Sequence, residues 1–151
     1  MINKKISLYL DTSVIGGYYD DEFQDDTRLL FEKIKEGEYS IFISNITEKE
    51  LKNAPDNVRE LLNEFEYRQV TVSDECVKLA DEYIKEGVVG LTNREDCIHI
   101  ATATMNDIDF LISWNFKHIV NIKRIRGYNS VNLKNGYRQL EIHSPKELGL
   151  L

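Results

Sequence analysis

The sequence predicts an α/β fold, a three-layer α/β/α sandwich around a central parallel sheet of four to five strands. Short stretches with a strand pattern alternate with longer stretches of helical spacing, and right-handed crossovers join parallel strands in chains of this kind. Residues 110–113 are almost uninterruptedly apolar, which is typical of a strand buried on both faces. A chain of 151 residues fits one core, so we expect a single domain over residues 1–151.

The amino-terminal half gives three clear elements. Residues 6–10 alternate Ile and Leu with Ser and Tyr, which predicts a strand that ends at Asp11. A helix is expected over residues 27–36, where apolar side chains recur at helical spacing and Gly37 follows as a stop signal. Residues 39–43 predict the second strand.

The remaining elements follow from capping signals and composition. Asn45 with Glu48, and Thr92 with Glu95, resemble capping boxes that open helices, and the first of these helices should end before Pro55. Ser73 is expected to cap a helix that stops at Gly87. We therefore predict helices over residues 57–67, 73–85 and 93–106, strands over residues 69–72, 110–113 and 139–142, and a helix in the segment after Asn121.

Composition excludes several classes of protein. Hydrophobic residues make up 42% of the chain and charged residues 30%, as in ordinary globular proteins. No apolar run approaches the roughly 20 residues that span a bilayer, and no signal peptide is recognisable at the start, so we expect a cytoplasmic protein without membrane contact. Cys76 and Cys97 lack metal-ligand or redox spacing and are interpreted as buried, reduced thiols.

Charge is distributed unevenly along the chain. The net charge is −7, which argues against a nucleic-acid partner when it is taken alone. Residues 110–140, however, contain no Asp or Glu, and their cationic residues are Lys117, Lys123, Arg124, Arg126, Lys134 and Arg138. The acidic residues between 20 and 26 do not have the spacing of a calcium loop and are interpreted as surface. The basic segment keeps RNA as a candidate partner.

Two polar side chains are expected at the carboxyl ends of parallel strands, where open α/β sheets bind ligands. Asp11 directly follows the first strand, and Asn115 lies two residues beyond the strand over residues 110–113. Asp at such a position is commonly a helix N-cap or a turn former. Asn115 could offer its side-chain carbonyl oxygen to the same crevice.

Two further acids are candidates for this crevice. Glu50 lies on the helical stripe with Ile46, Leu51 and Ala54, and an inward-facing glutamate needs a cation or hydrogen-bond donors to compensate its charge. Asp96 falls in the first turn of the helix over residues 93–106, where a favourable interaction with the helix dipole is the simpler interpretation. Carboxylates that gather at one place repel one another unless a cation lies between them.

Four segments together resemble the PIN-domain family, which includes the ribonuclease toxins of VapBC toxin–antitoxin pairs. The resemblance spans nearly the whole chain and is carried by LYLDTSVI around Asp11, SNITEKEL with Glu50, DCIHIATA with Asp96 and FLISWNF around Asn115. It implies a PIN-like fold and an endoribonuclease that uses Mg²⁺ or Mn²⁺. It also implies that Asp11, Glu50 and Asp96 hold the metal ion, while Thr12 and Ser13 shape the site and contact the substrate.

The resemblance also implies partners and a departure from the family pattern. A toxin of this family would be restrained by a small antitoxin protein, and such domains often pair as homodimers. Asn115 stands where many members carry a fourth acid, and the loss of one negative charge makes a second metal ion harder to neutralise.

Other residues are open to two interpretations. Lys117, Lys123 and Arg124 are candidates to bind the RNA backbone, although a solvated basic helix explains them equally well. His99 is interpreted as a hydrogen-bonded core histidine and left out of the site, and Trp114 as packing.

Two alternative functions are weighed. In a non-catalytic PIN-like RNA-binding module, Asn115 would mark a degenerate metal site. A phosphoryl-transfer domain also has an Asp after its first strand, but a dehalogenase-like site needs a second Asp where Ser13 stands, and a receiver domain needs an acid pair before Asp11.

Overall fold

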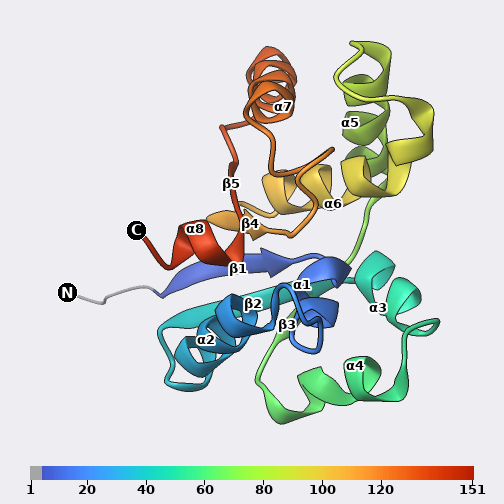
Figure 1. Cartoon of the computed structure of the whole chain (residues 1–151). Helices are drawn as coiled ribbons and strands as arrows, with labels where there is room; N and C mark the ends of the chain where they lie inside the picture. The colour runs from blue at the N-terminus through green and yellow to red at the C-terminus, as the bar shows by residue number, and fades with distance from the viewer. Residues whose placement is uncertain (1–4) are drawn as a thin grey trace.

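The computed structural model describes residues 5–151 and confirms the predicted α/β class. Its sheet has five parallel strands in the order β3-β2-β1-β4-β5 (Figure 1). The strands are β1 (Ile6–Leu10), β2 (Tyr39–Ser44), β3 (Arg68–Val70), β4 (Phe110–Ile112) and β5 (Glu141–His143). Because β1 lies between β2 and β4, the residue that follows β1 is in the middle of the carboxyl edge.

Helices cover both faces of the sheet, which gives the three expected layers. They are α1 (Thr12–Gly17), α2 (Gln24–Lys35), α3 (Asn45–Leu51), α4 (Asp56–Leu61), α5 (Asp74–Lys85), α6 (Arg94–Met105), α7 (Ile122–Lys134) and α8 (Pro145–Leu148). Helices α5, α6 and α7 contribute to the apolar cluster on one side of the sheet, and α1, α2, α4 and α8 to the cluster on the other. Two 3-10 turns, Leu62–Glu64 and Leu91–Asn93, complete the chain.

The central strand divides the interior into two apolar clusters. Leu8 and Leu10 pack with α1, α2 and α4 on one side, whereas Tyr9 packs with α5, α6 and α7 on the other. All three side chains are fully buried. The alternation in the sequence of β1 therefore separates two covered faces of the sheet rather than a core face from a solvent face.

Two of the predicted helix starts were wrong. Ser44, not Asn45, is the N-cap of α3, and Thr47 completes its capping box, because the Asn45 side chain instead accepts a hydrogen bond from the backbone N–H of Val72 (2.8 Å). The predicted box of Thr92 and Glu95 does not form, since Leu91–Asn93 winds into a 3-10 turn and α6 begins at Arg94 without a side-chain cap.

Other predictions held with shifted boundaries. Ser73 caps α5 as expected, and Gly37 and Gly87 end their helices with positive φ. The helix predicted over residues 57–67 is only α4 followed by a 3-10 turn, while α2 starts three residues before its predicted start. Strands β3, β4 and β5 are displaced or shortened by one to two residues, and the short helix α8 was not predicted.

The prediction about the cysteines is confirmed. Both cysteines are buried and free, as expected. Among the described residues, no helix is long and apolar enough to cross a membrane.

The close approach of Gly17 to the loop after β4 gives a stability test. A Cβ at Gly17 would lie 2.7 Å from the indole nitrogen of Trp114 and 2.9 Å from the hydroxyl of Thr27, whereas one at Gly16 meets nothing within 4 Å. Both positions are in α1. We expect Gly17→Ala to lower the free energy of unfolding by about 1–3 kcal/mol through overpacking, and Gly16→Ala to raise it by roughly 0.5–1 kcal/mol. Urea denaturation measures both, and equal effects would contradict this packing.

Candidate active site

Asp11 occupies the middle of the carboxyl edge and is buried there. Its backbone N–H donates to the carbonyl of Ile112 (3.3 Å), and its carboxylate caps α1 by accepting from the N–H of Val14 (3.3 Å). The N-cap role considered from the sequence is therefore real. The carboxylate also accepts hydrogen bonds from the hydroxyls of Ser13 and Ser113, both at 2.6 Å.

The electrostatics of Asp11 follow from this enclosure. Burial raises the pKa of its carboxyl, while the charge of His99 and the two serine hydroxyls act in the opposite direction. The net shift is upward, so without a further cation the ionised form is disfavoured. Ser113 was not singled out in the sequence, because a serine at the end of a strand carries no distinctive signal.

Glu50 reaches the same region from α3. Its Oε1 accepts hydrogen bonds from the hydroxyl of Thr12 (2.8 Å) and from Nε2 of His99 (2.7 Å), and its side chain is 30% exposed. Burial raises the pKa of Glu50, but the hydrogen bond and charge of His99 together with Thr12 outweigh burial and leave the pKa below its ordinary value. The carboxyl of Glu95 acts in the same direction, so this acid also lies close to Glu50.

His99 is the site residue that sequence reasoning left out. Its side chain is 2% exposed, and its second ring nitrogen, Nδ1, lies 2.6 Å from the hydroxyl of Tyr9. Burial alone would lower the pKa of the imidazole, but Glu50, Asp11 and Asp96 raise it, and the net shift is upward. The negative charges of all three acids therefore act on one imidazole.

Asp96 lies in the first turn of α6 and joins this group. Burial raises its pKa from the ordinary 3.8 to about 6, and the negative charges of Asp11 and Glu50 add to the shift while His99 opposes it. Helix-dipole placement does not account for an upward shift, because the amino end of a helix favours the charged form. Asp96 is thus held in an acidic neighbourhood at an energetic cost.

Asn115 contacts Asp96, but not as the sequence suggested. Its Oδ1 accepts from the backbone N–H groups of Lys117 (3.2 Å) and His118 (3.0 Å), and its Nδ2 donates to Oδ2 of Asp96 (3.2 Å). The two backbone donors fix the orientation of the amide. The expectation that Asn115 offers a carbonyl oxygen to the crevice was therefore wrong, and the residue acts as a hydrogen-bond donor to Asp96.

The donor set suits a hydrated divalent cation better than a closed cage. Within residues 5–151, no three His, Cys, Asp or Glu side chains converge closely enough to form a ready metal site. Mg²⁺ retains several water ligands and is commonly held through one or two carboxylates. Burial raises the pKa of both Asp11 and Asp96, and at Asp96 the charges of nearby acids add to the shift, so a cation at an open site of this kind would stabilise their ionised forms.

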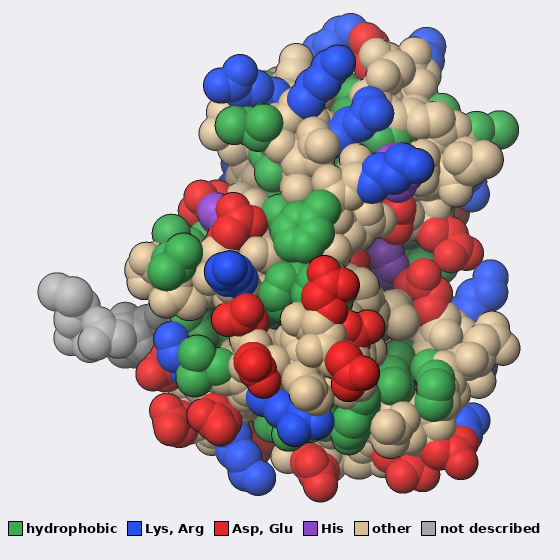
Figure 2. Space-filling model, in the orientation of Figure 1, with side chains coloured by type: hydrophobic (Ala, Val, Ile, Leu, Met, Phe, Trp, Pro, Cys, Tyr) green, Lys and Arg blue, Asp and Glu red, His purple; other side chains and the backbone are tan. Residues whose placement is uncertain are grey.

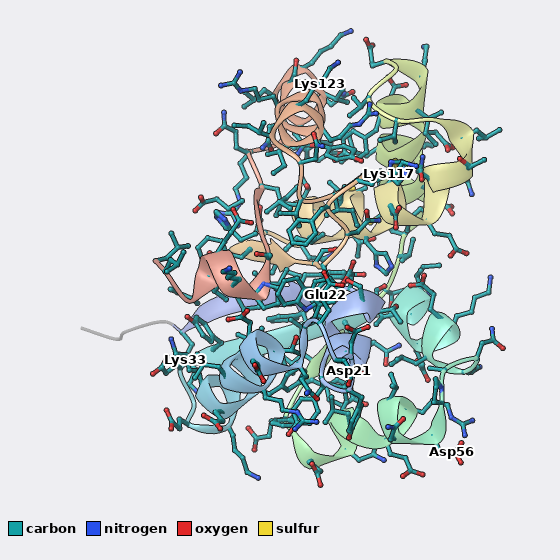
Figure 3. The ribbon with its side chains drawn as sticks, viewed as in Figure 1. Asp21, Glu22, Lys33, Asp56, Lys117 and Lys123 are labelled. Atoms are coloured by element: carbon teal, nitrogen blue, oxygen red, sulfur yellow. The ribbon has the colours of Figure 1, made fainter. Side chains whose placement is uncertain are left out.

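The basic residues predicted to bind substrate do not form one group. Lys117 is exposed and lies two residues after Asn115, whereas Lys123 lies at the far end of the molecule on α7 (Figure 3). Arg124 is half-buried and donates to the carbonyl of Val88, which ties α7 to the segment after α5. Figure 2 shows basic side chains gathered over α7 and acidic ones mainly over α1 and α2. Of the three, Lys117 lies on the loop after β4, whose Asn115 contacts Asp96.

Trp114 packs in the interior, as the sequence analysis expected. Its side chain is 7% exposed, its ring stacks on Phe23 with centroids 4.3 Å apart, and its indole N–H donates to Thr27 (2.9 Å).

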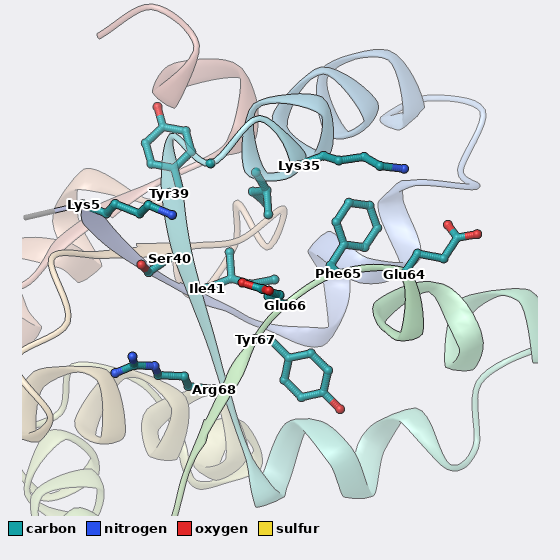
Figure 4. Close-up of a pocket in the computed structure, with 12 residues that line it drawn as sticks. Lys5, Lys35, Tyr39, Ser40, Ile41, Glu64, Phe65, Glu66, Tyr67 and Arg68 are labelled. Carbon is teal, nitrogen blue, oxygen red and sulfur yellow. The ribbon is translucent and has the colours of Figure 1, made fainter.

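A separate pocket opens at the opposite edge of the sheet. It has a volume of about 750 Å³ and lies beside the amino ends of β2 and β3 (Figure 4). Lys5, Lys35 and Arg68 line it together with Glu64 and Glu66, and none of the residues of the acidic cluster contributes. The acids that interact with His99 near the carboxyl edge therefore identify the candidate site better than the size of this pocket.

Comparison with solved structures defines the class of fold. The chain is similar to a chain of VapBC2 from Rickettsia felis bound to a DNA fragment from their promoter, with a TM-score of 0.60, 15% identity, and coverage of 92% of this chain and 98% of that chain. For FitAcB from Neisseria gonorrhoeae the TM-score is 0.58 and the identity 13%, and the match covers 92% of this chain and 98% of that chain. For VapC20 from Mycobacterium tuberculosis, described as a sarcin-ricin loop cleaving toxin, the TM-score is 0.56 and the identity 13%. The match covers 73% of this chain and 91% of that chain.

The fold is thus PIN-like, as the four sequence segments predicted. No protein-family model matches the chain, and no curated protein sequence matches it. The likeness is one of structure, at identities of 13% to 15%, and it concerns the fold alone.

The raised pKa of Asp96 predicts a stabilising substitution. In the metal-free protein, stability should fall as pH rises from about 4 to above 6, because the folded state holds the Asp96 proton more tightly than the unfolded state does. The side chain is partly exposed, so we discount the shift and expect Asp96→Asn to raise the free energy of unfolding by about 1–2 kcal/mol at pH 7.5. The gain should shrink towards pH 4.5.

Urea denaturation in EDTA at both pH values measures this effect. Asp21→Asn, at an exposed acid in the turn before α2, is the control and should change little at either pH. A loss of stability in Asp96→Asn at pH 7.5 would contradict the assignment of a strained carboxylate.

Proposed function

We propose that this protein is a metal-dependent endoribonuclease that hydrolyses RNA phosphodiester bonds with Mg²⁺ or Mn²⁺. The observation that carries the proposal is the gathering of Asp11, Glu50 and Asp96, from three separate segments, around His99 at the carboxyl edge of a PIN-like sheet. Ligand sites in open α/β folds lie at this edge. Hard carboxylate oxygens are the ligands that these two cations prefer.

Each residue has a distinct task in this proposal. Asp11, Glu50 and Asp96 would hold the ion, which supplies an activated water and neutralises charge on the phosphate. The hydroxyl of Thr12 orients Glu50, and that of Ser13 orients Asp11. These contacts limit the rotation of the carboxylates before substrate arrives.

Residues of the loop after β4 extend the site. Asn115 donates to Oδ2 of Asp96 and so orients this carboxylate. Among the predicted basic residues, Lys117 is the closest to Asn115 along the chain, and it would attract the RNA backbone. Lys123 and Arg124 on α7 would contribute from positions further along the chain. RNA is thus the proposed substrate.

We propose further that the nuclease acts as the toxin of a type II toxin–antitoxin pair, with a small antitoxin as its partner. The support is the kind of protein that shares this fold: the similar structures include VapBC2, FitAcB and a toxin–antitoxin complex from Klebsiella pneumoniae. The homodimer expected from the sequence stays a prediction.

A non-catalytic RNA-binding module is the second candidate. It is favoured by Asn115, which stands where a fourth acid is expected and turns its oxygen towards backbone N–H groups. In that case RNA would bind without cleavage.

Cleavage of single-stranded RNA separates the two candidates. We expect cleavage with Mn²⁺ that EDTA abolishes, and a decrease of at least about 100-fold in Asp11→Asn and in Asp96→Asn, because each removes a ligand of the ion. Asp21→Asn serves as the control for charge alone and should cleave normally. RNA binding without cleavage would favour the binding module, and equal cleavage by all variants would point to a contaminating nuclease.

Asn115→Asp tests the missing fourth acid. A carboxylate beside Asp96 would repel it, so we expect lower stability in EDTA but tighter Mn²⁺ binding, since ligand charge strengthens binding of a hard cation. Thermal melting with and without Mn²⁺ measures both effects. A variant whose melting temperature responds to Mn²⁺ no more than that of the wild type would count against a metal near Asp96.

A further inference from the structure

We propose that His99 is a positioning residue, which holds the carboxylate of Glu50 in the orientation that binds the divalent cation. The inference rests on the proposed function, because it concerns how the proposed metal ligand Glu50 is set in place. It assigns a role to a histidine that neither the acidic pattern nor the fold accounts for.

The first argument is that two donors converge on one oxygen of Glu50. The hydroxyl of Thr12 and Nε2 of His99 lie 2.8 Å and 2.7 Å from Oε1. Thr12 comes from α1 and His99 from α6, so Glu50 on α3 is held from two sides. This arrangement leaves Oε2 as the oxygen that can turn to a cation or its water.

The second argument is that the hydrogen on His99 must lie on the nitrogen that faces Glu50. The hydroxyl of Tyr9 donates to Oγ of Ser44 (2.7 Å), so its oxygen is available to accept from Nδ1 of His99. If Tyr9 instead donates to Nδ1, a neutral ring carries its hydrogen on Nε2. In the first arrangement the ring is an imidazolium with hydrogen on both nitrogens, because the ionised Glu50 carboxylate can only accept from Nε2; in the second the ring is neutral and its hydrogen is on Nε2.

The third argument is that the imidazole itself has little freedom. Tyr9 is fully buried in the central strand, and Ser44, which anchors its hydroxyl, is the N-cap of α3. The chain of contacts from Ser44 through Tyr9 and His99 to Glu50 therefore starts and ends on the same helix segment. A carboxylate fixed by such partners keeps its position when the ion is absent.

A second histidine–glutamate pair lies outside this hydrogen-bond network. His143 and Glu141 on β5 lie 3.4 Å apart, and their side chains are 20% and 65% exposed. This pair serves as the matched control, because it preserves the residue types without the buried network.

Two substitutions separate the two ring nitrogens of His99. The amide nitrogen of glutamine lies close to the position of Nε2, so His99→Gln should still donate to Glu50. The shorter His99→Asn offers its amide near Nδ1, where it can meet Tyr9 but cannot reach Glu50. Both variants keep a polar group in the interior, and they differ in the contact that the proposal requires.

Mn²⁺ binding to the full chain, measured by calorimetry without RNA, is the first readout. We expect His99→Asn to weaken Mn²⁺ affinity about 10- to 100-fold, His99→Gln to retain most of it, and His143→Gln to bind as the wild type does. Wild-type affinity in a folded His99→Asn variant would overturn the proposal, and so would equal losses in the asparagine and glutamine variants. A wild type that binds no Mn²⁺ would overturn it as well.

RNA cleavage is measured separately, so that the two proposals can fail independently. If His99 positions Glu50, His99→Asn should need more Mn²⁺ for half-maximal cleavage, and saturating Mn²⁺ should restore much of the turnover. Protein that binds Mn²⁺ with the expected order of affinities but cleaves no RNA would refute the nuclease function and leave the role of His99 intact.

Should His99→Asn fail to fold, nitrogen NMR of the wild-type histidine rings tests the same contact. We expect a slowly exchanging hydrogen on Nε2 of His99 that Glu50→Gln perturbs and His143→Gln does not. A ring without hydrogen on Nε2 would overturn the proposal.

Discussion

The constraint on which this structure depends is the burial of a carboxylate at the end of the central strand. Asp11 follows β1 and is enclosed by the hydroxyls of Ser13 and Ser113 and by the N–H of Val14. Donors of this kind reduce the cost of burying a carboxylate but do not cancel it, and its pKa stays raised. The elements around it must therefore supply polar partners where a core would otherwise be apolar.

The other polar residues of the site can be understood from this requirement. Glu50 and His99 form a partly buried pair in which each stabilises the charged form of the other, so the pKa of the acid is lowered and that of the histidine is raised. Asp96 has only the amide of Asn115 and more distant cationic charge, and its pKa rises to about 6. The cluster thus contains one acid whose pKa is lowered, Glu50, and two whose pKa stays raised, Asp11 and Asp96.

The sequence predicted the acids and the fold because both depend on local periodicity. Asp11 could be assigned from its position after a strand, and Glu50 from the stripe it shares with Leu51. His99 could not be assigned, since every residue of α6 from Cys97 to Thr104 is buried and no face is marked as polar. The orientation of Asn115 depends on two backbone N–H groups of the following turn, which no side-chain pattern reports.

The serine hydroxyls beside Asp11 have a second set of contacts. Ser13 accepts from the backbone N–H of Trp114 (2.9 Å), and Ser113 accepts from that of Asn115 (2.9 Å), while both donate to the same carboxylate. Two serine hydroxyls therefore connect the carboxylate of Asp11 to the backbone that leads to Lys117. A loop tied to a carboxylate through two hydroxyls has little freedom to move independently of it, so the acidic edge also sets the position of the segment that leads to Lys117.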